Sequence, residues 1–289
     1  MRKKILILGS AGQIGSHLKN FLRKKKYKVS EFDIENTANQ DLRKIKNKEL
    51  IKAIKKNDFV YFLAFDVGGS RYLKKYEKNY NFLMNNQLIM VNVFSLLKNY
   101  KKKFIFASSQ MSNMHFSNYG VLKKIGESLT ESINGISVRF WNVYGIEHDL
   151  QKSHVITDLI LKGFNNGTIK LLTNGEESRE FLYAEDCCKA LEVIMEKYNQ
   201  LLKNNKQIDL TTHKLTKIIQ VAKIIEKKFE SIGRKVKFVP SASCDSVQLN
   251  KKNKGKSSIR NYWKPKFTLE AGISEVFDFY NQNYKKFNL

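Results

Sequence analysis

The stretch Lys4-Ile5-Leu6-Ile7-Leu8-Gly9-Ser10-Ala11-Gly12-Gln13-Ile14-Gly15 decides the fold of this chain. An apolar run long enough for one buried strand leads into a glycine-rich turn, after which a helix is expected. Glycines at such a turn let the backbone approach a pyrophosphate, which the positive amino end of the helix attracts. The stretch predicts a dinucleotide site with contacts from Gly9, Gly12, Gln13, Ile14 and Gly15. A tight turn without a ligand is the alternative.

The rest of the first half alternates short apolar runs with longer amphipathic ones, which predicts a parallel sheet with helices on both faces. Strands are expected at 4–8, 27–32, 59–63, 103–107 and 135–140, and helices at 13–25, 48–55, 80–100 and 119–132. The predicted class is α/β, a Rossmann-like, doubly wound parallel sheet.

The second half is less regular and predicts a smaller C-terminal substrate-binding lobe. Helices are expected at 155–163, 184–198, 214–231 and 269–284, and strands at 169–172, 207–210 and 236–239. We expect a cofactor-binding domain at 1–165, and a lobe at 166–289 from which some segments return to the main sheet.

The charge is strongly basic, at +25 for 289 residues. The lysines are spread along the chain beside asparagines, without a basic arm or aromatics alternating with Arg, so a compositional bias explains them better than nucleic acid does. We expect no nucleic-acid partner.

The cysteines and histidines indicate neither disulfides nor a metal site. Two of the three cysteines are the adjacent Cys187 and Cys188, and the five histidines are scattered without ligand spacing. No apolar run approaches the roughly 18 residues of a membrane span. We therefore expect a cytoplasmic protein without metal or membrane partner.

A carboxylate at the end of the second expected strand favours NAD over NADP. Asp33 can accept hydrogen bonds from ribose hydroxyls and would repel a ribose phosphate, and no Arg directly follows it.

A second group of residues points to redox chemistry at a hydroxyl. Tyr119 and Lys123 lie one helical turn apart, and Ser109 follows a late strand. A free tyrosine has a pKa of about 10, so it becomes a base near neutral pH only if a nearby cation stabilises its phenolate. Lys123 can supply that cation, and Ser109 can orient the same substrate oxygen.

Taken together, these motifs resemble the extended short-chain dehydrogenases/reductases that modify nucleotide sugars, over nearly the whole chain. The resemblance implies that Tyr119 takes a proton from a sugar hydroxyl, usually at C4, while NAD accepts the hydride. It implies further cofactor contacts from Asp41, Leu42, Leu63, Tyr119 and Lys123, and substrate contacts from Gly68, Gly69, Ser109, Gln110, Asn142 and Arg179. It also implies a homodimer formed through the helices at 80–100 and 119–132.

Departures from the family pattern narrow the reaction. The dehydratases carry an acid pair after the catalytic Ser or Thr, and the 3,5-epimerases carry a Cys two residues after it, but Gln110 and Met111 stand here. A 4-dehydrogenase or reductase and a 4-epimerase remain.

The substrate follows from two further likenesses. Val67-Gly68-Gly69 resembles members that act on GDP-sugars, and 108–114 resembles those that oxidise C4 of GDP-manno-heptose for capsule polysaccharide, with 2-oxoglutarate as a candidate hydride acceptor. A non-catalytic NAD-binding regulator or an RNA-binding Rossmann protein is the alternative of another class, and the intact Ser109, Tyr119 and Lys123 argue against both.

Overall fold

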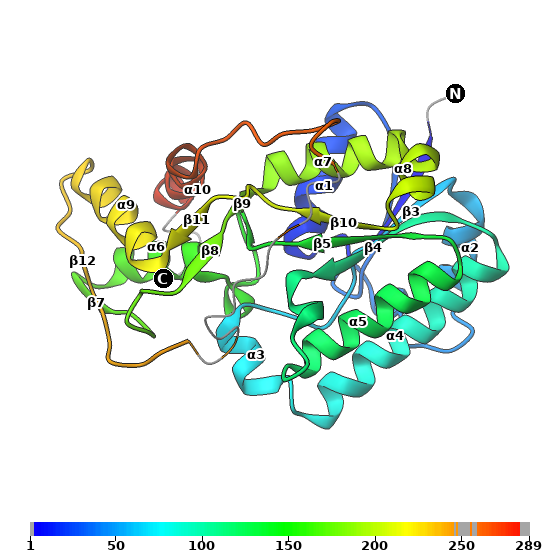
Figure 1. Ribbon diagram of the computed structural model, residues 1–289, viewed down its shortest axis with the longest axis horizontal. Coiled ribbons are helices and arrows are strands. Elements are labelled where there is room, and N and C mark those ends of the chain that lie inside the picture. The colour runs from blue at the N-terminus through cyan, green and yellow to red at the C-terminus, as the bar shows by residue number, and fades with distance from the viewer. Residues whose placement is uncertain (1–2, 246, 248–254, 256–258, 284–289) are drawn as a thin grey trace.

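A computed structural model describes residues 3–245, 247, 255 and 259–283 and shows a parallel sheet at the centre of the molecule (Figure 1). The six strands lie in the order β10-β5-β4-β3-β1-β2. Their bounds are Gln207–Leu210, Ile136–Phe140, Lys103–Ser109, Phe59–Phe62, Lys4–Leu8 and Lys28–Phe32. Each adjacent pair is parallel. The predicted Rossmann-like sheet is confirmed.

Helices cover both faces of this sheet because its strands are apolar on both sides. Side chains alternate between faces along a strand, so Ile5 and Ile7 pack with one cluster and Leu6 and Leu8 with the other. The first face is covered by α1 (Gln13–Lys24), α7 (Ala184–Glu196) and α8 (Tyr198–Asn204), and the second by α2 (Lys48–Lys56), α4 (Tyr80–Asn99) and α5 (Asn118–Ser132).

The order of the strands fixes where a ligand can bind. The chain winds from β1 outward to β2 and then crosses back to β3 on the other side of β1. In open parallel sheets the crevice lies at the carboxyl ends of the strands where the winding reverses. Here that point lies beyond Leu8 and Phe62, next to the glycine-rich turn.

A smaller lobe lies beside the carboxyl ends of the strands, at the left of Figure 1, around a third hydrophobic cluster. It contains α6 (Val155–Asn165), α9 (Ile218–Glu230), α10 (Leu269–Asn283), β7 (Thr168–Lys170), β8 (Ser178–Glu180), β11 (Leu215–Lys217) and β12 (Lys237–Val239). β11 pairs with β8 and β12 with β7, while β6 (Val143–Tyr144) pairs with β9 (Leu182–Tyr183) near the junction. Although they lie late in the sequence, β10 and α7 belong to the main sheet and its covering layer.

Several elements differ from the predictions, among them the short strands β6, β8 and β9, which were not expected. The expected helix at 214–231 begins with strand β11, because these residues pair with β8. The expected helix at 184–198 is two helices, α7 and α8, and the short helix α3 (Ser70–Tyr76) was not expected. Only Leu73 of α3 is buried, so no apolar period marks it in the sequence. The short 3-10 segments η1 (Ala38–Gln40), η2 (Gln110–Asn113) and η3 (Leu150–Lys152) complete the fold.

Candidate active site

The glycine-rich turn joins β1 to α1 at the winding reversal and leaves space that a side chain would fill. Gly9 has φ +87°, and a Cβ there would lie 2.6 Å from the backbone nitrogen of Ala64. A Cβ on Gly15 would lie 1.9 Å from the carbonyl oxygen of Gly9. The N-cap of α1 is Gly12, which provides no side-chain cap, so the first-turn N–H groups face outward for an anion.

Carboxylates fix the loops around this turn. Asp33 Oδ2 accepts a hydrogen bond from the Ala11 N–H at 2.9 Å, and Oδ1 accepts one from the Glu35 N–H at 3.1 Å. Asp41 is paired with Arg43, whose hydrogen bonds lower the pKa of that carboxyl. The Leu42 carbonyl accepts from Asn92 Nδ2 at 2.9 Å. The turn, the uncapped helix end and Asp33 together fit a dinucleotide.

Two more predicted cofactor residues lie against the same turn. Leu63 donates its N–H to the carbonyl of Leu8 at 2.9 Å, which extends β3 beside the end of β1. Gln13 Nε2 donates to the carbonyl of Val143 at 3.3 Å and so connects the start of α1 with β6.

The predicted catalytic residues meet at the same edge. Ser109 ends β4, and its hydroxyl is hydrogen-bonded to Tyr119 on α5. Burial raises the pKa of Tyr119 to about 12, and the Ser109 hydrogen bond opposes the rise. Lys123 Nζ donates to the carbonyl of Ala107 at 2.6 Å. Lys123 Nζ also lies 5.6 Å from the centre of the Tyr119 ring.

A buried ion pair between Glu127 and Arg139 lies next to the catalytic residues. Arg139 on β5 donates two hydrogen bonds to the Glu127 carboxylate on α5, at 2.6 and 2.7 Å, and Ser108 Oγ donates a third at 2.7 Å. Burial alone would raise the pKa of Glu127, but these hydrogen bonds outweigh it and lower the pKa. The pair ties the carboxyl end of β4 to α5 and β5.

The predicted substrate residues occupy three surroundings. Gly68 and Gly69 pack against the loop before α6, where a Cβ on Gly69 would lie 2.3 Å from the Ser153 carbonyl oxygen. Gln110 is buried in η2 beside Ser109. Asn142 Oδ1 is buried and has no hydrogen-bond partner in the described chain.

Arg179 of β8, predicted to meet the substrate, is paired with the Asp245 carboxylate. Asp245 lies 66 residues away in the sequence and was not predicted. Both side chains are nearly buried, so this pair forms a defined polar group in the lobe.

Comparison with known proteins identifies the family. Residues 5–208 match the sequence profile of the family described as NAD dependent epimerase/dehydratase. The chain belongs to this family. It is therefore an enzyme of the sugar-nucleotide-modifying kind, and its cofactor is NAD.

Similar proteins within the family cover almost the whole chain. GDP-L-colitose synthase of Yersinia pseudotuberculosis is 26% identical over 96% of this chain and 97% of its own. A GDP-6-OMe-4-keto-L-xylo-heptose reductase from C. jejuni superposes with a TM-score of 0.81 at 18% identity, over 98% of both chains. The GDP-mannoheptose C4 reductase MlghC from Campylobacter jejuni, with NADP bound, gives 0.76 at 19% identity, over 97% of this chain and 98% of that one. Both superpositions show the shared fold.

The role of Asp33 in this family member can be tested by removing its charge. We expect Asp33→Asn to weaken NAD binding about tenfold and to reduce the preference for NAD over NADP, because a charged acceptor for the ribose is lost. Isothermal titration with each dinucleotide measures both effects.

Asp58→Asn is the matched control for this change. Asp58 Oδ2 also accepts a backbone N–H, that of Lys4 at 2.8 Å, but at the amino-terminal edge of the sheet. An NAD affinity that falls equally in both variants would exclude the assigned role of Asp33.

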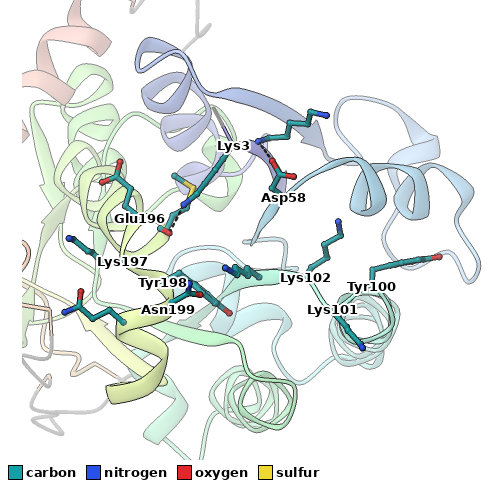
Figure 2. Close-up of a pocket in the computed structure, with 13 residues that line it drawn as sticks. Lys3, Asp58, Tyr100, Lys101, Lys102, Glu196, Lys197, Tyr198 and Asn199 are labelled. Atoms are coloured by element: carbon teal, nitrogen blue, oxygen red, sulfur yellow. Dashed lines mark hydrogen bonds between the residues drawn. The ribbon is translucent and has the colours of Figure 1, made fainter. Parts of the chain in front are cut away.

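A cavity of about 730 Å³ lies at that opposite edge, away from the catalytic group (Figure 2). Several of its lysines, among them Lys102, Lys103 and Lys197, follow the carboxyl ends of α4 and α7, where cations balance the helix dipoles. Lys102 Nζ donates to the carbonyls of Lys55 and Asn57. Figure 2 shows the ammonium ends of Lys101 and Lys197 turned in different directions, so the lysines do not converge on one point.

Neither metal ligation nor a membrane span appears in the described parts of the chain. Their His, Cys, Asp and Glu side chains form no group of three or more that could hold a metal ion. Their helices include none with the length and apolarity that crossing a bilayer requires.

Proposed function

We propose that this enzyme oxidises C4 of a nucleotide sugar, with GDP-manno-heptose as substrate and its 4-keto form as product. The observation that carries the proposal is the hydrogen-bonded pair Ser109 and Tyr119, with Lys123 one turn along α5, at the edge that also holds the glycine-rich turn. Oxidation of an alcohol requires a group that accepts the hydroxyl proton and, next to it, a dinucleotide that accepts the hydride.

Tyr119, Ser109 and Lys123 have different roles in the proposed reaction. Tyr119 accepts the proton of the sugar hydroxyl, and Ser109 hydrogen-bonds the same oxygen and aligns it. Lys123 provides the positive charge that favours the phenolate. NAD, when bound, supplies the hydride acceptor. Because burial raises the pKa of Tyr119 to about 12 before ligands bind, the phenol is expected to keep its proton until the site is assembled.

The surroundings of Ser109 favour a reaction that stops at the ketone. Gln110 and Met111, which follow Ser109, are buried and uncharged at neutral pH. Loss of water from the sugar, or exchange of protons at its carbons, requires an acid or base at this wall. We therefore assign neither dehydration nor 3,5-epimerisation to the enzyme.

The choice of a GDP-heptose rests on the Val67-Gly68-Gly69 segment and on the structural similarity to the two Campylobacter reductases of GDP-heptoses. In this proposal Arg179 meets the diphosphate, Asn142 and Gln110 meet the sugar, and Gly68 and Gly69 border it. The product would serve capsule or surface polysaccharide synthesis, and 2-oxoglutarate would take the hydride from the reduced cofactor.

Mass spectrometry of the product tests the reaction and the substrate together. Purified protein is incubated with GDP-manno-heptose, GDP-mannose and UDP-glucose, with and without 2-oxoglutarate. We expect loss of two hydrogens from the heptose substrate, and more product when the keto acid is present. An unchanged mass with a new chromatographic peak would make the enzyme a 4-epimerase, and conversion of UDP-glucose alone would overturn the choice of nucleotide.

We also propose that the enzyme is a cytoplasmic homodimer, with a cofactor domain at 1–165 and a substrate lobe mainly at 166–289. Support for the dimer comes from large apolar side chains that α4 and α5 expose, namely Tyr80, Val91, Val121, Ile125 and Leu129. Light scattering of Ile125→Lys should give a monomer, whereas an unchanged mass would place the contact elsewhere.

A further inference from the structure

The ammonium group of Lys123 lies among aromatic rings from the loop after β3, from β4 and from α5. Its Nζ is 3.5 Å from the ring centre of Phe65, 5.1 Å from that of Phe106 and 5.6 Å from that of Tyr119. Phe65 directly follows Ala64 beyond the end of β3. The rings of Phe65 and Tyr119 meet edge to face at 5.8 Å, so Phe65 contacts both Lys123 and Tyr119.

A buried ammonium needs such partners. Lys123 is 3% exposed, and its three N–H donors have one hydrogen-bond acceptor in the described chain, the Ala107 carbonyl at 2.6 Å. Burial by itself favours the neutral amine and lowers the pKa of Lys123. The face of an aromatic ring attracts a cation, and the attraction is greatest where water is excluded.

The other charged and titratable groups near Lys123 do not replace this contact. Glu127, on the same helix, favours the charged amine, but its carboxylate is already bound by Arg139 from β5. Tyr119 is neutral while its pKa stays near 12. From β4, Ala107 and Phe106 offer a carbonyl and a ring, neither of which titrates. After the Ala107 carbonyl, the ring of Phe65 is therefore the main partner that can stabilise the positive charge.

We propose that Phe65 is a positioning residue that keeps Lys123 charged and seated against the Ala107 carbonyl through the face of its ring. Its importance for catalysis rests on the proposed function, in which Lys123 favours the Tyr119 phenolate. The contact with the ammonium does not depend on that function.

Two substitutions distinguish the effect of the aromatic ring from the effect of side-chain size. Phe65→Leu keeps an apolar side chain of similar reach and removes the ring, whereas Phe65→Tyr keeps the ring. Phe65 is only half-buried, so both changes should leave the fold intact, which circular dichroism checks. The pKa of Lys123 is then measured without cofactor by NMR of protein carrying carbon-13 at the lysine ε position, with Lys123→Met to assign the signal.

We expect Phe65→Leu to lower the pKa of Lys123 by about one pH unit and to remove the upfield ring-current shift of its ε-CH₂ protons. Phe65→Tyr should keep both the pKa and the shift of the original protein. An unchanged pKa and an unchanged shift in Phe65→Leu would overturn the proposal, as would equal losses in Leu and Tyr variants.

The same variants distinguish this proposal from the proposed function. If the NMR signals change as expected and the pH profile of sugar oxidation shifts with them, both are supported. If the NMR signals change while Lys123→Met still oxidises the sugar at the original rate, the role of Phe65 stands and the assigned role of Lys123 in catalysis fails.

Discussion

Tyr119→Phe should lower kcat for sugar oxidation by about 10²- to 10⁴-fold, the usual contribution of a positioned acid–base group. The change removes one oxygen, the one that is hydrogen-bonded to Ser109 and proposed to take the substrate proton. The ring stays in place at 8% exposure, so the packing against Phe65 is kept. The fall should therefore appear mainly in kcat, with a much smaller effect on NAD affinity measured by titration.

The pH profile gives a second readout of the same change. A residue that acts as a base must first lose its own proton, so activity increases as the pH rises through its pKa. A raised pKa therefore moves this increase in activity to higher pH. The original enzyme should gain activity as the pH increases, and Tyr119→Phe should lose this dependence.

Tyr100→Phe is the matched control for the loss of a phenol oxygen. Tyr100 is the C-cap of α4 at the amino-terminal edge of the sheet, away from the reaction. Its variant should keep kcat. If Tyr119→Phe also retained full activity, another group would have to be the base.

The main sheet could be predicted because each of its strands is marked by its own short stretch of sequence. Strands buried on both faces appear as continuous apolar runs, and β1, β3 and β4 lie where such runs predict them. Pairing between strands that are distant in the sequence leaves no such local pattern. Leu215–Lys217 form a strand because β8 lies beside them, and Leu215 is half exposed there, so the sequence alone favoured an extension of the following helix.

The candidate site divides in the same way. Gly9, Ser109 and Tyr119 belong to short motifs with fixed spacing, and the fold brings their elements to one edge. Contacts between separate motifs were missed. Arg179 meets Asp245 across 66 residues, and Lys123 meets Phe65 from the loop that follows β3.

The ion pair of Glu127 and Arg139 had a partial signal. Tyr119, Lys123 and Glu127 stand at intervals of four, on one face of α5, so an acid was predictable beneath the catalytic pair. Its partner comes from the neighbouring strand β5, and only the parallel pairing of β4 with β5 brings Arg139 close.

Glu127→Ala should destabilise the enzyme by about 3–5 kcal/mol, because it leaves the Arg139 guanidinium buried without its counter-charge. Both side chains are almost fully buried, at 0% and 8% exposure, so water cannot replace the lost partner. Unfolding by urea, followed by tryptophan fluorescence, gives the free-energy difference. The catalytic pair above it should become less ordered, so kcat is expected to fall as well.

An exposed ion pair in the same protein provides the control. Lys217 and Glu176 meet at the surface of the lobe with about half of each side chain exposed. Glu176→Ala should therefore cost about 1 kcal/mol or less. Similar losses of unfolding free energy in the two variants would mean that burial does not make the Glu127 pair more stabilising than an exposed pair.

Replacing both buried partners separates the charge from the packing. In Glu127→Leu/Arg139→Met no charge remains unpaired, so most of the stability lost in Glu127→Ala should return. The pKa of Glu127 is lowered in the folded protein, so its contribution is present above the ordinary carboxyl pKa and is lost as the pH falls through the lowered value. The original protein should therefore lose stability at acidic pH relative to the double variant. Parallel pH curves for the two would contradict this account, because they would mean that the pair is not ionised in the folded enzyme.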